Sequence, residues 1–346
     1  MQLKPLSMPA QTAFSQVVEA ALTAEHLRTV ADLPGAFTHK IVKGYKYWYY
    51  QFSEPSGARR QIFVGPDTEA VQALVSRAKQ PDDSNFSALT RSALALGCAD
   101  VLTRHFKVLR RLSDYGFFQA GGVLIGTHAF VAYGNMLGVQ WSSVDASLTH
   151  DIDFAHAGKN ISLALAADAE VRTHEAIQSL EMGFLPISGL AGKTGGAYLI
   201  PNEKEFRLEF LTTVGQGREV PYEHPRLHIT LQPLKFMEYS LVNVQQTAIL
   251  SNTGAIMVNI PHPARYALHK LIVAGEREGA FSMKSGKDYM QAGLLLAVLR
   301  EAKPWDVEEA WEDLMARGNG WRIRAQRGLI TLDTRFPGER FREWLE

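Results

Sequence analysis

The spacing of apolar positions predicts helices on either side of a strand-rich stretch in the first third of the chain. Residues 11–33 carry apolar side chains at three- and four-residue intervals, which indicates an amphipathic helix. Aromatic residues then dominate 44–65 around a turn-rich middle, so a β-hairpin is predicted there. Asp67 is the expected N-cap of a helix that ends near Lys79, and a longer helix is expected over 86–114.

Strands and helices alternate in the middle of the chain. A short apolar strand is expected to end at Gly126, where a helix begins, and a loop over 134–150 leads into a strand over 151–154. The pattern then predicts one helix and three more strands, at 170–183, 206–211, 247–251 and 255–260. Interleaving of this kind predicts an α+β fold with a mixed β-sheet core and flanking helices.

Helical periodicity returns after residue 261. Helices are expected over 264–275, from about Lys284, and over 305–317. The chain therefore divides into three predicted parts. These are an N-terminal helical segment with an aromatic β-hairpin (1–115), a mixed-sheet domain (116–260) and a C-terminal helical domain (261–346).

Charge and cysteine content narrow the functional classes. The 36 Lys and Arg residues balance the 36 Asp and Glu residues, which excludes a protein that holds a polyanion over its whole surface. Cys98 is the only cysteine, so no disulfide staples the chain, and we expect a small core residue in a reducing compartment. No apolar run has the length of a signal peptide or a membrane span, so the sequence predicts a cytoplasmic protein without membrane contact.

Acidic residues in two predicted strands are the main candidates for chemistry. Asp151 and Asp153 are two positions apart, so both point to the same face of their strand while Ile152 faces the core. Glu209 lies between two apolar residues of a later strand, and pairing of the two strands would bring a third carboxylate alongside. Three converging anions require a cation, and ligation by oxygen alone suits Mg²⁺ or Mn²⁺.

Gly126 and Thr127 fit the opposite wall of such a site. A strand that ends in Gly allows a phosphate to approach the backbone. A helix that begins with a hydroxyl residue directs N–H groups and that hydroxyl toward the phosphate. The two halves of the predicted site are therefore complementary.

These residues resemble the pattern of the polymerase-β-like nucleotidyltransferase superfamily. That pattern is an apolar strand, Gly with Gly, Ser or Thr, a helix, Asp-apolar-Asp or Glu, and a carboxylate in a later strand. The matching stretches are Leu124 to Phe130, Asp151 to Phe154, Leu208 to Thr212, Pro263 to Leu271 with His269-Lys270-Leu271, and the aromatic residues at 45–50. More narrowly, the chain looks similar to the bacterial group related to abortive-infection and toxin-type nucleotidyltransferases.

The resemblance implies transfer of a nucleoside monophosphate from an NTP to an acceptor, dependent on Mg²⁺ or Mn²⁺. Asp151 and Asp153 would hold two metal ions, and Glu209 would complete the second ion's ligands and help activate the acceptor hydroxyl. Gly126 and Thr127 would bind the nucleotide. Further cationic contacts to it would come from Lys270, Arg277 and Lys287.

Two departures from the pattern stand out. The gap between Gly126 and Asp151 is longer than usual, so the loop 134–150 must absorb it, and Glu209 stands where Asp is expected. The acceptor is left open between an RNA end, a protein and a small molecule. A catalytically silent nucleotide- or nucleic-acid-binding protein of the same fold remains an alternative, as does one partner of a toxin–antitoxin pair.

Other conspicuous residues have simpler interpretations. A stripe of Arg104, Lys107 and Arg111 is typical of a solvated helix face, and at least half of the aromatic residues at 45–50 are expected in a core. His128 and His150 are expected to be hydrogen-bonded structural residues. Gly192-Lys193-Thr194 lacks the upstream Gly of a P-loop, because Ile187 stands there.

Overall fold

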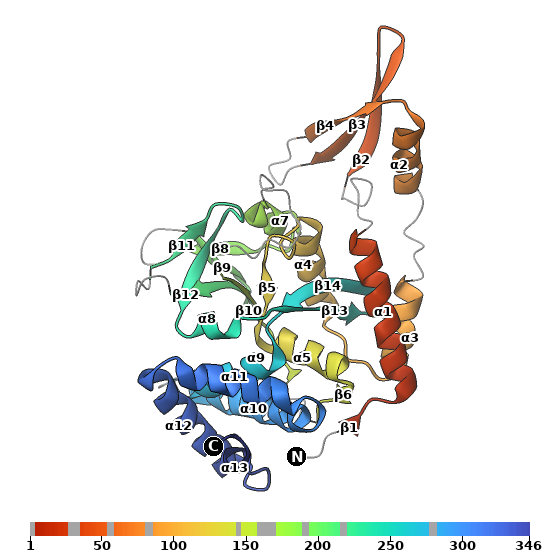
Figure 1. Cartoon of the computed structure of the whole chain (residues 1–346). Coiled ribbons are helices and arrows are strands. Elements are labelled where there is room, and N and C mark those ends of the chain that lie inside the picture. Colours follow the sequence, from red (N-terminus) through yellow and green to blue (C-terminus); the bar gives the residue numbers. More distant parts are fainter. Residues whose placement is uncertain are drawn as a thin grey trace.

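We describe the protein from a computed structural model. Figure 1 shows the whole chain. The residues it describes are 4–26, 35–53, 59–79, 86–142, 147–157, 171–188, 194–214, 220–276 and 282–346.

A seven-stranded mixed sheet forms the centre of the molecule, with strand order β11-β12-β10-β7-β5 and β9 and β8 extending from β10. Its strands are β5 (Val123–Leu124), β7 (Ile152–His156), β8 (Leu185–Ser188), β9 (Thr194–Ile200), β10 (Glu203–Thr213), β11 (Tyr222–His224) and β12 (Ile229–Leu234). Strand β10 runs parallel to both β7 and β12, whereas β5 is antiparallel to β7. The short helices α7 (Thr173–Gln178) and α8 (Met237–Ser240) follow β7 and β12 in the chain.

One face of the sheet is closed by aromatic packing. Phe154 of β7 and Phe210 of β10 are fully buried and stack with ring centroids 5.0 Å apart, as cross-strand neighbours in register. Phe117 meets both rings edge to face. The alternating residues Asp153 and Glu209 are thereby directed to the other face, because successive side chains of a strand point to opposite sides.

Two helices and a second sheet pack beside this core. Helices α1 (Met8–His26) and α3 (Phe86–Ala95) cover a hairpin of β13 (Gln245–Ser251) and β14 (Gly254–Ile260). Next to them lie α4 (Thr103–Asp114), α5 (Gly126–Leu137), and the paired short strands β1 (Lys4–Pro5) and β6 (Val139–Gln140).

The remaining N-terminal residues form a small sheet with a helix at one end of the molecule (Figure 1). Strands β2 (Ala36–Val42), β3 (Tyr45–Ser53) and β4 (Arg59–Pro66) are antiparallel, and α2 (Glu69–Lys79) packs on them.

The C-terminal part is entirely helical among its described residues. It comprises α9 (Pro263–Glu276), α10 (Ser282–Ala302), α11 (Pro304–Ala316), α12 (Asn319–Arg335) and α13 (Phe341–Leu345). Helices α9 and α10 pack against each other, and Figure 1 shows this group below the central sheet. None of the described helices combines the length and apolarity that crossing a bilayer requires.

The α+β fold class is confirmed, but several local predictions are wrong. The helix predicted over 86–114 is two helices, because Gly97 adopts a left-handed backbone (φ 106°) and the intervening chain turns toward β13, where Val101 N donates to Leu250 O. The hairpin predicted at 44–65 is confirmed as β3 and β4, and β2 adds a third strand that was not predicted. Asp67 is not the cap of α2. Instead, its carboxylate accepts from Trp48 Nε1 at 2.6 Å, while Thr68 Oγ1 accepts from the amide of Val71 at 3.4 Å.

The sequence pattern also missed several elements. Strands β8, β9, β11 and β12 and helices α12 and α13 were not predicted, since they are short or contain little apolar periodicity. The division of the chain at residues 115 and 260 stays a prediction. Gly192 and Lys193 lie outside the described residues.

Candidate active site

The two aspartates and the glutamate line one cavity of about 590 Å³. In the parallel pairing of β7 with β10, Asp153 is the register partner of Glu209, so their side chains leave the same face of the sheet side by side. Asp151 lies two positions before Asp153 and shares that face. The sequence prediction that these three residues come together at one site therefore agrees with their positions.

Gly126 borders the same cavity directly beside Asp153. It lies just after β5, the antiparallel neighbour of β7, and has a left-handed backbone with φ 62°. A Cβ atom at this position would lie 2.1 Å from Oδ2 of Asp153, which is far inside the van der Waals contact distance of a non-bonded carbon and oxygen. Glycine is therefore required here both by the backbone conformation and by the closeness of Asp153.

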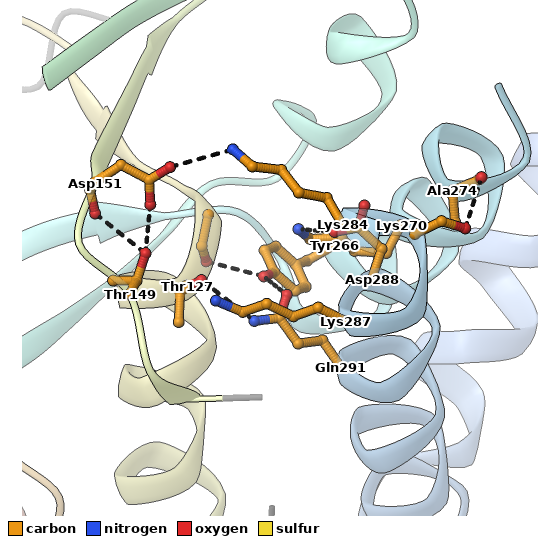
Figure 2. Close-up of polar contacts among 12 residues, drawn as sticks. Thr127, Thr149, Asp151, Tyr266, Lys270, Ala274, Lys284, Lys287, Asp288 and Gln291 are labelled. Atoms are coloured by element: carbon orange, nitrogen blue, oxygen red, sulfur yellow. Dashed lines mark hydrogen bonds and ion pairs between the residues drawn. The ribbon is translucent and has the colours of Figure 1, made fainter. Parts of the chain in front are cut away.

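A hydrogen-bonded chain fixes the start of α5 relative to the C-terminal helices (Figure 2). The Tyr266 hydroxyl of α9 lies 2.9 Å from the carbonyl oxygen of Gly126 and 2.9 Å from Oε1 of Gln291 in α10. Nε2 of Gln291 donates to Thr127 Oγ1 at 3.4 Å. Thr127 is consequently buried and engaged with α10, whereas Gly126 borders the cavity.

Three lysines of α9 and α10 surround the site, each with a partner (Figure 2). Lys270 lines the cavity and forms an ion pair with Asp288 at 2.6 Å, both side chains being largely buried. Lys287 donates to the carbonyl of Leu148 at 2.5 Å. Lys284, which also lines the cavity, reaches Oδ2 of Asp151 at 3.5 Å.

Of the predicted phosphate-binding cations, only Lys270 lines the cavity among the described residues. Lys287 is turned toward the chain before β7, and burial together with the charge of Lys270 lowers its pKa. Arg277 lies outside the described residues. Lys284 is the described lysine that contacts a predicted metal ligand.

Burial and the neighbouring carboxylates of Asp151 and Glu209 together raise the pKa of Asp153 to about 7, against the opposing charges of Lys270 and Lys284. Such a group is protonated far more readily than an ordinary aspartate in the absence of a cation. The position therefore favours a bound positive charge.

Asp151 has a different environment. Burial opposes its ionisation, but the hydroxyl of Thr149, the ammonium group of Lys284 and a backbone hydrogen bond together lower its pKa. Thr149 Oγ1 donates to Oδ1 and Lys284 to Oδ2, so both carboxylate oxygens are engaged (Figure 2). The Asp151 carboxylate is thus ionised and held toward α10.

The carboxylates of Asp151, Asp153 and Glu209 are the candidate ligands for a metal ion. Within the described ranges, no three His, Cys, Asp or Glu side chains stand close enough together to hold one. The chemistry nevertheless fits a hard cation, because three carboxylates share one wall and a buried Asp153 is destabilised by its acidic neighbours. Lys284 and Thr149 engage both carboxylate oxygens of Asp151.

Sequence reasoning missed one wall of the cavity. The end of β12 and the start of α8 contribute it, through Pro233, Leu234, Lys235, Phe236, Met237 and Ser240. Phe236 has a left-handed backbone (φ 67°), which is uncommon for an aromatic residue and places a sharp turn at the cavity edge. Nothing in the local pattern distinguished this apolar run from an ordinary core strand.

His128, next to Thr127, belongs to the core and does not line the cavity. Its Nε2 atom lies 2.9 Å from Nδ1 of His105. Burial lowers the pKa of His128 to about 3 and that of His105 to about 4, so both rings are neutral. This agrees with the structural interpretation of His128.

Comparisons with known proteins define the class to which this fold and site belong. A family model described as "Nucleotidyltransferase" matches residues 103–316. This range includes β7, β10, α5, α9 and α10 of the site. The chain belongs to this nucleotidyltransferase family. Among curated proteins, none matches the chain.

One solved structure is also similar, an antigenic nucleotidyltransferase-like protein from Paracoccidioides brasiliensis. It is 12% identical, with 66% of this chain and 95% of that chain covered, and the TM-score is 0.31.

Proposed function

We propose that this protein transfers a nucleoside monophosphate from an NTP to an acceptor hydroxyl, with Mg²⁺ or Mn²⁺ bound at Asp151, Asp153 and Glu209. Family membership supports the general reaction. The observation that carries the assignment to these residues is the register of Asp153 with Glu209, on the same sheet face as Asp151, with Gly126 packed directly beside Asp153 at the same cavity.

The nucleotide binds between the start of α5 and the face of α9 and α10. Gly126 places no side chain between its backbone and the cavity, so a phosphate can approach that backbone, and Lys270 supplies a cation from α9. Asp288 orients the Lys270 ammonium through their short ion pair. The Tyr266 and Gln291 hydrogen bonds hold these two walls at a fixed separation.

In the reaction, the acceptor oxygen forms a bond to the α-phosphorus and the bond from that phosphorus to the β,γ-diphosphate oxygen breaks. Pyrophosphate leaves, and the acceptor proton passes to Glu209, whose carboxylate lines the cavity next to Asp153. The metal, when bound, neutralises the charge on the phosphates and stabilises the attacking and leaving oxygens.

Lys284 makes a contact that must break before Asp151 can serve as a metal ligand. Its side chain is more than half exposed, so releasing Asp151 requires little desolvation or rearrangement. Once released, the same ammonium group is available to the triphosphate. We therefore propose that Lys284 exchanges the carboxylate for phosphate when the metal–nucleotide complex enters.

The test is incubation with each of the four α-labelled NTPs, Mg²⁺ and total cellular RNA or lysate. Label transfer by the wild type is expected to be abolished in Asp153→Asn and Glu209→Gln. It is expected to persist in Glu205→Gln, a matched control at an exposed position of the same strand. Nucleotide binding without transfer, unaffected by Asp153→Asn, would instead support a silent nucleotide-binding protein.

Membership of the toxin-type group is a separate proposal. It rests on the motif resemblance alone and predicts that expression of the wild type, but not of Asp153→Asn, arrests growth of a bacterial host. A neighbouring gene whose product relieves that arrest would identify a toxin–antitoxin pair. Equal growth with both variants would contradict this proposal and leave the transfer reaction untouched.

A further inference from the structure

The sheet of β2, β3 and β4 has no role in the reaction proposed above. Its residues lie within 36–66, whereas the family match begins at residue 103. Among the described elements, α2 contacts it at β2 and β4. Its two faces differ in what covers them.

One face is closed. Trp48 and Tyr50 of β3 are buried there, with Phe37 and His39 of β2 as their cross-strand neighbours. Helix α2 packs against this sheet, and the Trp48 indole donates to Asp67 just before the helix. This side holds a small core around Trp48 and Tyr50, which accounts for two of the five aromatic residues at 45–50, while Ile41 and Ile62 on the same side are exposed.

The opposite face is open and aromatic. Tyr45, Tyr47 and Tyr49 alternate with the buried residues of β3, and Phe63 of β4 is the register partner of Tyr49. The Phe63 ring lies 5.5 Å from that of Tyr49 and 6.1 Å from that of Tyr47. Tyr45 is 69% exposed and Phe63 is 57% exposed, so these rings are presented to solvent.

Positive charge accompanies the rings. Lys40, the cross-strand partner of Tyr47, is exposed and its ammonium nitrogen lies 4.7 Å from the centre of the Tyr49 ring. Within residues 36–66 the chain has five Lys and Arg residues and one acidic residue, although the whole chain is neutral. Aromatic rings interleaved with cations are complementary to unpaired bases and to the phosphates between them.

We propose that this face binds single-stranded RNA. The inference rests on the proposed function and deepens it, because it names single-stranded RNA as the class of acceptor for nucleotidyl transfer. From Tyr45 to Tyr49 the strand spans roughly 13 Å. That length matches the two or three bases that other aromatic sheet platforms stack.

Polar groups on the same face favour RNA over DNA. Thr38 is the register partner of Tyr49, and Gln51 pairs with Gln61 of β4. Thr38 Oγ1 is buried and therefore out of reach of a bound strand, whereas Gln61 is exposed and Gln51 is half-buried. The amide groups of Gln51 and Gln61 supply hydrogen bonds to a ribose 2′-hydroxyl, which DNA lacks.

The experiment measures binding of fluorescent oligouridylate to the full chain by fluorescence anisotropy. The double variant Tyr45→Ala with Phe63→Ala is expected to weaken binding by about tenfold or more, because each stacked base contributes to the affinity. The matched control is Ile41→Ala with Ile62→Ala, which removes two side chains of similar exposure from the opposite face of the same sheet. Control binding is expected to equal that of the wild type.

Two further measurements sharpen the result. Oligodeoxyuridylate of the same length is expected to bind more weakly than oligouridylate. Lys40→Gln is expected to reduce the slope of log affinity against log salt by about 0.7, the contribution of one phosphate contact on a single strand. Equal effects of the two double variants, equal binding of the two oligonucleotides, or no binding of either would overturn the proposal.

Failure of this proposal is distinguishable from failure of the catalytic one. Asp153→Asn is expected to bind oligouridylate like the wild type while transferring no nucleotide. If Tyr45→Ala with Phe63→Ala binds RNA normally but all transfer still depends on Asp153, the acceptor surface is wrong and the active site stands. If RNA binding requires the aromatic face but the protein never uses an NTP, the proposed active site is wrong and the RNA-binding face stands.

Discussion

Gly126 and Asp153 are so close that no other residue fits at position 126: a Cβ there would lie 2.1 Å from the Asp153 carboxylate. The strand carboxylate and the start of the nucleotide-facing helix are therefore parts of one packed unit. This relationship joins the two halves of the predicted motif, which are well separated in the sequence. It also defines the first test.

Gly126→Ala is expected to lower nucleotidyl transfer by about 100-fold or more, because Asp153 must move by an ångström or so to admit the methyl group. Gly183→Ala is the matched control. Gly183 has a similar left-handed backbone, φ 80°, but open space around the added atom. Gly183→Ala should lose about 1–2 kcal/mol of stability through backbone strain, and Gly126→Ala should lose more because the methyl group also displaces Asp153, both measured by urea unfolding. Equal transfer activity of Gly126→Ala and Gly183→Ala would contradict the close packing of Gly126 against Asp153.

The pH dependence of stability reports on the acidic cluster. Asp153 has a folded-state pKa of about 7, raised from its ordinary 3.8, so its favourable contribution is complete below pH 3.8 and is lost as the pH rises toward 7. The metal-free wild type should therefore lose stability across this interval relative to Asp153→Asn. The difference should reach at most about 4 kcal/mol. Urea unfolding at a series of pH values measures it, and parallel curves for the two proteins would refute the assignment.

Lys284→Gln is expected to strengthen Mn²⁺ binding in the absence of nucleotide. The substitution frees Asp151 from an ion pair whose lysine is 59% exposed, so the gain should be about two- to fivefold. Stability should change by less than about 0.5 kcal/mol. Isothermal titration calorimetry measures the affinity, with Lys107→Gln on the exposed surface of α4 as control. Weaker Mn²⁺ binding in Lys284→Gln would mean that this lysine does not compete with the metal.

Asn259 positions the approach to the site from β14. Its buried amide nitrogen donates to the carbonyls of Phe118 and Gly122, at 2.7 and 2.8 Å, in the turn that leads into β5 and Gly126. Asn259→Leu leaves both carbonyls without this donor and should cost about 2–4 kcal/mol of unfolding free energy. Gln246→Leu, which removes only the exposed amide that donates to Asn259 Oδ1, should cost under about 0.5 kcal/mol. Similar losses in the two would show that the buried amide is not needed.

Sequence periodicity predicted the parts of the site that depend on local geometry. Asp151 and Asp153 share a face because strand side chains alternate, and Gly126 follows a strand because apolar residues precede it. The pairing of Asp153 with Glu209 was a hypothesis only, because register between distant strands is set by the packing of Phe154 on Phe210.

Long-range contacts were beyond the sequence pattern. Tyr266 and Gln291 reach the start of α5 from two C-terminal helices, and no local spacing indicates that these helices meet there. The break at Gly97 was missed because apolar residues recur at helical intervals on both sides of it. Likewise, the open face of β3 could not be separated from its buried face until the position of α2 was known.

The central claim is transfer of the α-phosphoryl group together with its nucleoside. The most direct measurement compares the same NTP labelled at the α- or the γ-phosphate, with Mg²⁺ and single-stranded RNA as acceptor. We expect α-label to enter the RNA in step with pyrophosphate release, and γ-label to appear only in pyrophosphate. Transfer of γ-label to the acceptor, or release of inorganic phosphate in place of pyrophosphate, would contradict it.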